Sequence, residues 1–397
     1  MVDEIAVIGL GYVGLPLAIA AAKAGFYVTG IDLDKNKIND IQNGFSSIEG
    51  IDISDLGNSI KEKKLAVTND FSRIKQSRIV IVCVPTPLTL DHQPDLSFVV
   101  DATEQLSIHI KEDTLVIYES TVSTGTTRNI LTPLIADLSK LSQDKFLVAF
   151  SPERIDPANL TWNVSNTPKL VAGLNEISAK KAADFYLKFI DKVEICKSLE
   201  IAETAKLLEN SFRLINIAFI NELAVFCNKQ GVDILEVIKA ANTKPYGFMP
   251  FYPSLGAGGH CIPVDPVYLS NIAASVGAPI TILELAHDIN ISTPKHFIKR
   301  AENELGSLSE KKILVIGIAY KPNVADIRES AALNLILGLR EKGALTTWHD
   351  DLVNDWNGEK SVPLSADYDL AILATNHDHL DLTNIGSVPI LNTRGSV

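Results

Sequence analysis

The sequence predicts an α/β protein in which two doubly wound parallel sheets are joined by a long central helix. Short apolar runs alternate with helical segments through the first half of the chain, the pattern of parallel strands connected by crossover helices. From Leu199 onward, apolar residues recur at spacings of three and four, which predicts one long amphipathic helix. Residues 312–320 then repeat residues 4–12 almost position for position, which predicts a second, degenerate sheet domain.

The expected strands are short apolar runs bounded by polar or glycine-containing segments. They are residues 5–8, 27–31, 79–84, 114–118, 145–150 and 169–172, the repeat at 312–320, and residues 344–348 and 370–374. An alanine-rich helical pattern runs from the first strand to Lys23, and helical patterns continue after the long helix to about Leu305. A stretch rich in proline and glycine interrupts them from Pro245 to Pro266. We therefore expect three domains, residues 1–198, 199–305 and 306–397.

The long helix carries an apolar stripe along nearly its whole length, from about Leu199 to Gln230. The stripe consists of Ile201, Ala205, Leu208, Phe212, Ile215, Phe219, Leu223 and Phe226. One small domain is not expected to cover so long a stripe, so the pattern predicts a homodimer formed through this helix.

Composition and charge exclude several classes of protein. The 397 residues carry a formal net charge of −12, without the cluster of lysines and arginines that binds a phosphate backbone, so nucleic acid is not an expected partner. No apolar run approaches the roughly 18 residues that span a bilayer, and the acidic first residues run directly into a strand, so we expect neither a membrane span nor a signal peptide. The four cysteines are far apart without metal-ligand spacing, which predicts reduced thiols in a cytoplasmic protein and no metal site.

A glycine motif between the first strand and its helix predicts a dinucleotide site. In Gly9-Leu-Gly-Tyr-Val-Gly14, Gly9 permits the tight turn, Gly11 lets the backbone approach a pyrophosphate, and Gly14 lets helix and strand pack closely. The start of the helix offers N–H groups to the phosphates. Asp32 follows the second strand, where a carboxylate accepts hydrogen bonds from the ribose diol and repels a 2′-phosphate. The motif therefore favours NAD over NADP in a Rossmann-like domain.

Two further features bear on this prediction. Lys35 and Lys37 lie close to Asp32 in the sequence and could weaken the preference for NAD. The repeat in the second half carries Ala319 in place of the second glycine and has no third glycine. We expect the second half to have lost the pyrophosphate geometry and to hold a substrate instead.

A second glycine-rich segment, Gly256-Ala-Gly-Gly-His-Cys261, ends on a cysteine. Neighbours with little side-chain bulk would let a ligand come close to the thiol, which favours a catalytic Cys261. An isolated cysteine is more often a small buried hydrophobe, and Cys83 in a strand and Cys227 on the long helix fit that description. Asp265, four residues after Cys261, could orient a group or accept a proton.

Several motifs together resemble the UDP-glucose/GDP-mannose dehydrogenase family, and the resemblance covers essentially the whole chain. They are Gly9-Leu-Gly-Tyr-Val-Gly14-Leu-Pro, Val84-Pro-Thr-Pro87, Glu119-Ser-Thr121-Val, Ser151-Pro-Glu-Arg154, Gly258-Gly-His-Cys-Ile-Pro-Val-Asp265, Lys321-Pro and Asp326-Ile-Arg-Glu-Ser330. The fourth and fifth motifs look like the branch that acts on UDP-N-acetylhexosamines. Residues 162–169 and 242–252 are most similar to its UDP-N-acetylglucosamine members.

The resemblance implies an oxidoreductase that oxidises the 6-hydroxyl of a UDP-sugar twice, to the carboxylate, with two NAD⁺ in turn, for surface polysaccharide or glycan precursor synthesis. UDP-N-acetylglucosamine is the expected substrate; UDP-N-acetylmannosamine, UDP-N-acetylgalactosamine and UDP-glucose are the alternatives. A catalytically silent NAD-sensing protein is an alternative of another class, but it would not need the set Cys261, Lys206 and Asn210. A two-electron dehydrogenase of β-hydroxy acids would need neither Cys261 nor the second sheet domain.

Catalytic roles follow from the same resemblance. Cys261 would trap the aldehyde as a thiohemiacetal and later carry a thioester, while Lys206 and Asn210 would stabilise the oxyanion. Asp265 would orient or deprotonate the cysteine or the hydrolytic water. Thr121 would position a water or a proton acceptor, although a helix N-cap is an equally good interpretation. Glu153 would lie near the reacting carbon; the alternative is a loop salt bridge.

The expected binding residues form two groups. The NAD group is Gly9, Gly11, Tyr12, Val13, Gly14, Asp32, Pro85, Thr86, Thr121 and Arg328. The UDP-sugar group is Glu153, Arg154, Lys206, Asn210, Tyr252, Gly258, Lys321 and Arg394. An acidic protein needs such local cations to bind a diphosphate.

The sequence departs from the family pattern at three places. Pro157 stands where glucose-type members have a second glutamate, so the residue that positions the hydrolytic water is open. Ser254-Leu255 replaces a glycine and proline pair ahead of the cysteine loop, and the last domain looks short.

Overall fold

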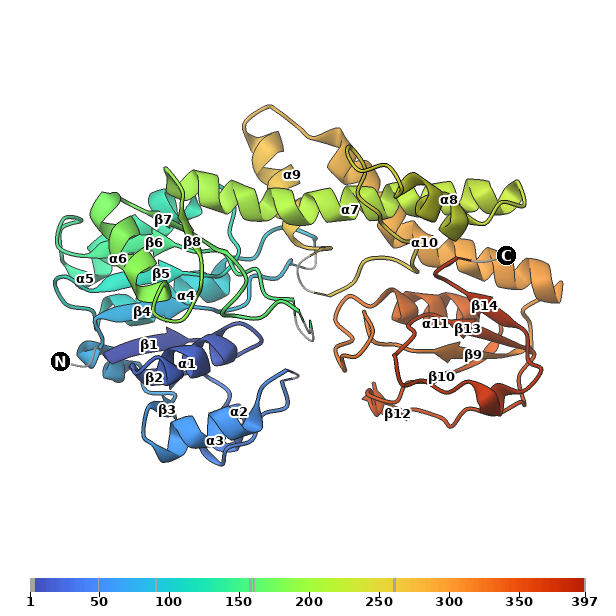
Figure 1. Cartoon of the computed structure of the whole chain (residues 1–397), viewed down its shortest axis with the longest axis horizontal. Helices are drawn as coiled ribbons and strands as arrows, with labels where there is room; N and C mark the ends of the chain where they lie inside the picture. Colours follow the sequence, from blue (N-terminus) through green and yellow to red (C-terminus); the bar gives the residue numbers. More distant parts are fainter. Residues whose placement is uncertain are drawn as a thin grey trace. The chain divides into compact units, whose positions relative to one another are not determined.

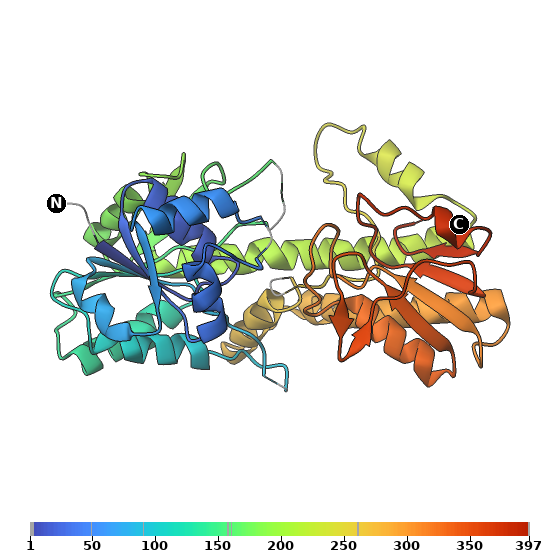
Figure 2. The same cartoon turned by 90° about the horizontal axis from the view of Figure 1, so that it is seen from below.

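The computed structural model describes residues 4–48, 50–89, 91–156, 159, 161–259 and 262–395. The chain forms two compact units, Met1–Leu208 and Glu209–Val397, each with its own sheet and core (Figures 1 and 2).

The first unit is built on an eight-stranded sheet in the order β3-β2-β1-β4-β5-β6-β7-β8. The strands are β1 Glu4–Ile8, β2 Tyr27–Ile31, β3 Leu65–Thr68, β4 Ile79–Val82, β5 Leu115–Tyr118, β6 Leu147–Phe150, β7 Lys169–Gly173 and β8 Val193–Ile195. The strands from β3 to β6 all run parallel, and β7 pairs antiparallel with β6. β3 and β8 were not expected, because β3 alternates buried and more exposed residues rather than forming a continuous buried run, and β8 is mostly exposed.

Helices cover both faces of this sheet. They are α1 Gly14–Lys23, α2 Lys35–Gln42, α3 Ile53–Lys61, α4 Ser97–Ser107, α5 Thr132–Ser139 and α6 Glu176–Tyr186. Successive residues of β1 point to opposite faces, so Ile5 and Val7 join the core under α1 and α6 while Ala6 and Ile8 join the core under α4 and α5. Burial on both faces explains why the central strands are continuous apolar runs.

The long helix is α7, Leu199–Lys229, which begins in the first unit and ends in the second. Its apolar stripe is largely exposed; the exposed members are Ile201, Leu208, Phe212, Phe219 and Phe226. Glu203, Lys206, Asn210 and Asn221 are instead buried. The buried side also carries apolar residues such as Leu207, Leu214 and Ile220, so α7 has apolar residues on both its buried and its exposed side.

The second unit continues with α8 Ile234–Ala241, α9 Asp265–Ser275 and α10 Thr281–Leu305. Its sheet has four parallel strands in the order β10-β9-β13-β14. These are β9 Lys312–Ile316, β10 Leu345–His349, β13 Leu370–Leu373 and β14 Ile390–Asn392, and a hairpin of β11 Asp355–Trp356 and β12 Glu359–Lys360 lies between β10 and β13 in the chain.

Helices pack against one face of the second sheet. α10 and α11, Ala331–Glu341, bury Ile298, Ala301 and Leu335 against Ile313 and Val315 of β9. The other face is covered by the connections on either side of β13, residues 362–368 and 380–388, the second of which includes a short 3-10 helix, Thr383–Ile385. In the described part of the chain, no helix is long and apolar enough to cross a membrane. Among the same residues, no group of three or more potential ligands could hold a metal ion.

Candidate active site

The expected NAD residues of the first unit gather where parallel strands end. The glycine turn follows β1, Asp32 follows β2, Pro85 and Thr86 follow β4, and Thr121 follows β5. The order 3-2-1-4-5-6 places the point where the strand order reverses between β1 and β4. Ligands of open α/β sheets bind at this edge, in the crevice at that reversal.

The glycine turn has the shape that the sequence predicts. Gly9 has φ +89°, and a Cβ on Gly14 would lie 1.8 Å from the carbonyl oxygen of Gly9, so these two positions require glycine for packing within the protein. A Cβ on Gly11 would meet nothing within 4 Å. No side chain caps the start of α1 at Val13. Open space beside an uncapped helix start is what a pyrophosphate needs, so this site fits NAD.

Asp32 is held as a carboxylate at the end of β2. It accepts hydrogen bonds from the backbone N–H groups of Leu10 at 2.9 Å and Asp34 at 2.9 Å. Burial raises its pKa, but these bonds and Lys37 outweigh the burial and hold the pKa below its usual value. The Lys37 ammonium lies 2.9 Å from Oδ2 of Asp32. Of the two lysines that could weaken the preference for NAD, Lys37 therefore points toward Asp32. Its positive charge offsets part of the negative charge that a 2′-phosphate would meet.

Thr121 does not cap a helix. It lies in the loop after β5, and the next helical segment begins at Thr127, whose N-cap residue is Thr126. The N-cap interpretation is therefore wrong.

A buried polar cluster around Glu119, a motif residue to which the sequence assigned no role, lies beside this loop. Glu119 is 1% exposed; it pairs with Lys169 at 2.8 Å and accepts a hydrogen bond from the Tyr186 hydroxyl. A glutamate placed directly after a fully buried strand was the available signal, because a carboxylate there must find partners. The cluster fixes the backbone from which Thr121 extends.

Two residues of α7 each form a buried polar pair with a residue from another segment. The first pair joins Lys206 of α7 to Glu153, which lies after β6. The Lys206 ammonium donates to the backbone oxygen of Glu153 at 2.6 Å and lies 3.9 Å from Oε2 of the same residue. Both residues are at least nine-tenths buried, and the Glu153 carboxylate also accepts from the N–H of Ile155. The first turns of α7 are fixed by Glu203, which accepts hydrogen bonds from the N–H groups of Gly125 and Thr127. Lys206 is therefore held on a rigid helix.

Asn210 and Asp265 form the second pair, in the second unit. Asn210 donates from Nδ2 to Oδ2 of Asp265 at 2.6 Å, and both side chains are buried. Asp265 is the first residue of α9, where the helix dipole favours a negative charge. Asn210 follows Lys206 by one helical turn along α7, so the two expected oxyanion donors project from the same side of that helix.

The residues ahead of Cys261 are anchored at both ends. Ser254 donates its N–H to Oδ1 of Asn221 at 2.9 Å, and Ala257 donates its N–H to Oδ1 of Asn290 at 2.6 Å. Leu255, one of the departures from the family pattern, is buried in the core of the second unit. The departure thus fills space within the fold.

Gly258 and Gly259 do not leave space for a ligand beside their own Cα atoms. A Cβ on Gly258 would lie 2.7 Å from the backbone oxygen of Glu329, and one on Gly259 would lie 2.8 Å from the ring of Tyr320. Both glycines therefore allow close packing against the loop that carries Lys321. The catalytic role of Cys261 stays a prediction. Cys261 itself lies outside the described residues, as do His260 and Pro157.

The expected cations have different surroundings. Arg154 donates to the backbone oxygen of Pro168 at 2.7 Å within the first unit. Arg328 is exposed and pairs with Asp326, with Nη2 of Arg328 2.6 Å from Oδ2. Arg394 is exposed, and Lys321 is half-buried with its ammonium 5.9 Å from the centre of the Tyr320 ring. Tyr252 is 57% exposed.

Comparison with known proteins identifies the family. Models of the UDP-glucose/GDP-mannose dehydrogenase family match residues 3–190 as the NAD binding domain, 200–292 as the central domain and 314–393 as the UDP binding domain. A UDP-N-acetyl-D-glucosamine 6-dehydrogenase of Pseudomonas aeruginosa is 33% identical over 97% of this chain and 92% of its own length.

Two solved structures are similar over nearly the whole chain. The UDP-D-ManNAc dehydrogenase of Pyrococcus horikoshii has a TM-score of 0.90 at 31% identity and covers 98% of this chain and 95% of its own. The UDP-glucose dehydrogenase of Pyrobaculum islandicum has a TM-score of 0.92 at 25% identity and covers 99% and 94%. The chain therefore belongs to the UDP-glucose/GDP-mannose dehydrogenase family and is an NAD-dependent nucleotide-sugar dehydrogenase.

Proposed function

We propose that this enzyme oxidises the C6 hydroxyl of a UDP-N-acetylhexosamine to the carboxylate, and that UDP-N-acetylglucosamine is its substrate. Relatives that share about a third of its residues carry the names of N-acetylglucosamine and N-acetylmannosamine enzymes, which supports the class of sugar. The resemblance of residues 162–169 and 242–252 to N-acetylglucosamine members favours that sugar.

The observation that carries the proposal is the pair of buried polar contacts one helical turn apart on α7. The Lys206 ammonium donates to the backbone oxygen of Glu153 and lies 3.9 Å from Oε2 of the same residue. Asn210 presents an amide with a second N–H beyond the one that Asp265 accepts. Donors fixed in a buried site can stabilise the negative oxygen of an alkoxide or a tetrahedral species. Cys261 precedes Asp265 by four residues in the chain.

The reaction needs two oxidations at one carbon. NAD⁺, when bound, accepts the hydride in each of them. The Cys261 thiolate adds to the aldehyde carbon and forms a thiohemiacetal, whose oxidation gives a thioester. Water then adds to the thioester, the C–S bond breaks, and the acid leaves with the thiol restored. Lys206 and Asn210 hold the oxyanion, the backbone of Glu153 positions the Lys206 ammonium, and Asp265 keeps Asn210 in place.

The test is an NADH assay with UDP-N-acetylglucosamine, UDP-N-acetylmannosamine, UDP-N-acetylgalactosamine and UDP-glucose. We expect two NADH for each sugar oxidised and the highest kcat/KM with UDP-N-acetylglucosamine. One NADH per sugar would contradict the double oxidation, and a higher kcat/KM with another sugar would reassign the substrate. NAD⁺ binding without turnover of any nucleotide sugar would favour the NAD-sensing alternative.

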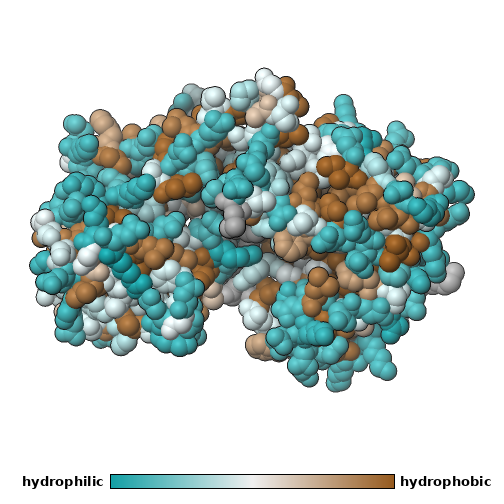
Figure 3. Space-filling model, turned by 180° about the vertical axis from the view of Figure 1, so that it is seen from behind, coloured by the Kyte–Doolittle hydropathy of each residue, from teal (hydrophilic) through white to brown (hydrophobic). Residues whose placement is uncertain are grey.

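We also propose that the enzyme is a homodimer formed through α7. The exposed apolar side chains of α7 lie at spacings of seven or four along one stripe, and Phe212 packs edge-on against Phe251 beside it. On the face drawn in Figure 3, hydrophobic side chains gather in patches among hydrophilic ones. Phe219, which is 61% exposed, is the point to test. Phe219→Glu should give monomers in sedimentation at micromolar concentration, and a wild-type monomer would contradict the proposal.

A further inference from the structure

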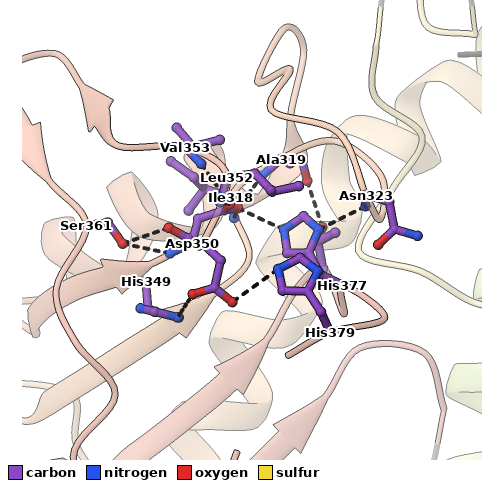
Figure 4. Close-up of polar contacts among 12 residues, drawn as sticks. Ile318, Ala319, Asn323, His349, Asp350, Leu352, Val353, Ser361, His377 and His379 are labelled. Atoms are coloured by element: carbon purple, nitrogen blue, oxygen red, sulfur yellow. Dashed lines mark hydrogen bonds and ion pairs between the residues drawn. The ribbon is translucent and has the colours of Figure 1, made fainter. Parts of the chain in front are cut away.

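A buried histidine and aspartate lie next to the loop that carries Lys321. Asp350 follows β10, and His377 follows β13; their side chains are 0% and 1% exposed. The Nε2 atom of His377 lies 3.2 Å from Oδ2 of Asp350 (Figure 4). Neither residue was expected from the sequence to take part in binding or catalysis.

Asp350 is saturated with hydrogen bonds. Its Oδ2 accepts from the N–H groups of Ile318 at 2.7 Å and Ala319 at 3.1 Å, in addition to His377. Its Oδ1 accepts from the N–H groups of Leu352 and Val353. Burial raises the pKa of Asp350, but the bonds from His377 and these backbone groups outweigh it and lower the pKa to about 2. Asp350 is therefore a carboxylate that can only accept.

The two partners of the imidazole assign its tautomer. The backbone N–H of Asn323 donates to Nδ1 of His377 at 2.9 Å, so Nδ1 carries no proton. Nε2 faces a carboxylate, so Nε2 carries the proton. His377 is thus a neutral imidazole that accepts on one side and donates on the other, and both of its polar atoms are used inside the protein.

The imidazole fixes one end of the segment 318–323, here named the Lys321 loop. Asn323 has φ +64°, a left-handed conformation that asparagine tolerates better than most residues. Its Nδ2 donates to Oδ2 of Asp378 at 2.7 Å, and the N–H of Asp378 donates back to Oδ1 at 3.1 Å. At the other end, the Thr375 hydroxyl donates to the backbone oxygen of Ala319 at 2.7 Å. Lys321 lies between these two anchors.

We propose that His377 is a positioning residue for nucleotide-sugar binding: as a neutral imidazole between Asp350 and the N–H of Asn323, it holds the Lys321 loop in the conformation that binds the diphosphate. The inference rests on the proposed role of Lys321 in UDP-sugar binding. His377 does not contact the substrate; it acts by fixing the backbone at Asn323, two residues from the ammonium-bearing side chain.

The neighbouring His379 supplies a matched control. Its ring stacks on that of His377, with 5.7 Å between the ring centres, and its Nε2 lies 3.4 Å from Oδ2 of Asp351. No hydrogen bond from His379 to the Lys321 loop is present among the described residues, and its side chain is 50% exposed. A loss of imidazole at 379 therefore changes local packing and the contact with Asp351 without removing a bond to Asn323.

The experiment separates the two nitrogen atoms of His377 by substitution. His377→Asn keeps a polar atom near the position of Nδ1 and can accept from Asn323, whereas His377→Gln keeps a donor near the position of Nε2 and loses that acceptor. Isothermal titration with UDP and with NAD⁺ gives the two dissociation constants, and the NADH assay gives KM and kcat. Lys321→Ala serves as the reference for loss of the diphosphate contact.

We expect His377→Gln to raise the dissociation constant for UDP and the KM for the UDP-sugar about tenfold, the effect of one lost hydrogen bond. The kcat and the affinity for NAD⁺ should stay within about twofold, because the glycine turn of the first unit is a separate site. His377→Asn should lie nearer the wild type, and His379→Gln should match the wild type.

Four results would overturn the inference. Equal UDP affinity in His377→Gln and wild type would show that the imidazole positions nothing, and a fall in kcat without a rise in KM would show a different role. If neither His377 variant folds, hydrogen exchange in the wild type decides, since rapid exchange of the Asn323 amide would disprove the bond to Nδ1. An unchanged UDP affinity in Lys321→Ala would instead refute the proposed role of Lys321, and the inference with it. A wild type that binds no UDP would refute the proposed function itself.

Discussion

The two sheet domains begin with the same turn and differ in its surroundings. Gly9 has φ +89° and donates its N–H to the oxygen of Ile31, while Gly317 has φ +78° and donates its N–H to the oxygen of His349. The next residue donates to an aspartate in both cases, Leu10 to Asp32 and Ile318 to Asp350. The backbone plan is therefore shared.

The residues that follow each turn differ in the space and the helix start that they offer to a ligand. In the first domain, open space beside Gly11 and the uncapped start of α1 remain for a pyrophosphate. In the second, Ala319 is fully buried and α11 does not begin until Ala331, so no helix starts directly after the turn. His377 and four backbone N–H groups already occupy the carboxylate of Asp350. The second turn thus keeps the backbone plan of the first but lacks the adjacent helix start that the first turn offers to a pyrophosphate.

The largest effect is expected from Cys261, which belongs to neither turn. Cys261→Ala should lower kcat by roughly a thousandfold or more, because the aldehyde could no longer be held covalently for the second oxidation. NAD⁺ binding, measured by titration calorimetry, should be unchanged, because the expected cofactor contacts do not include the cysteine. Full activity in Cys261→Ala would refute the covalent mechanism.

Gly11→Ala tests the open space in the first turn. The new methyl group would meet no protein atom within 4 Å, so the melting temperature should stay the same while the dissociation constant for NAD⁺ rises about tenfold or more. Gly14→Ala is the contrasting variant, because its methyl group would lie 1.8 Å from the oxygen of Gly9 and should lower stability by about 1–3 kcal/mol. Unchanged NAD⁺ affinity in Gly11→Ala would place the pyrophosphate elsewhere.

Asp350→Asn tests the closed second turn. The pKa of Asp350 lies at about 2 in the fold, against 3.8 for the ordinary group, so its ionisation adds about 2 kcal/mol of stability. Because the folded pKa is the lower one, this stabilisation is complete above about pH 4 and is lost as the pH falls to about 2. The free energies of unfolding of wild type and variant, measured with denaturant, should therefore differ at pH 7 and converge near pH 2. If the difference in free energy is the same at pH 2 as at pH 7, the stabilisation does not come from the ionised carboxylate of Asp350.

The smallest effect concerns the choice between NAD⁺ and NADP⁺. Asp32 should give NAD⁺ the higher kcat/KM, but the Lys37 ammonium at 2.9 Å reduces the repulsion of a 2′-phosphate. Asp32→Ala should therefore lower the ratio of kcat/KM for NAD⁺ to kcat/KM for NADP⁺. Lys37→Ala should raise the same ratio by a few-fold. Lys35→Ala is the control, because Lys35 is exposed and has no ion pair with Asp32 among the described residues. An unchanged ratio in Asp32→Ala would show that Asp32 is not the ribose partner.

The sequence by itself determined the features that depend on local chain chemistry. Apolar runs fixed the central strands because both faces of a parallel sheet are buried. The glycines of the first turn could be assigned because only glycine fits the positive φ at Gly9 and the close approach at Gly14. The apolar stripe of α7 also follows from spacing alone, as do the motifs that placed the chain in its family.

The tertiary structure alone decided which groups meet across the chain. Lys37 turns onto Asp32, Asn210 reaches Asp265 across 55 residues, and Asp350 is taken by His377. Long side chains have several rotamers, and a buried carboxylate selects whichever donor the fold brings near, so the spacing in the sequence cannot name the partner. The packing of Gly258 and Gly259 against Glu329 and Tyr320 could not be predicted for the same reason. A glycine in the sequence indicates that another group packs closely against the backbone, but only the fold shows which group that is.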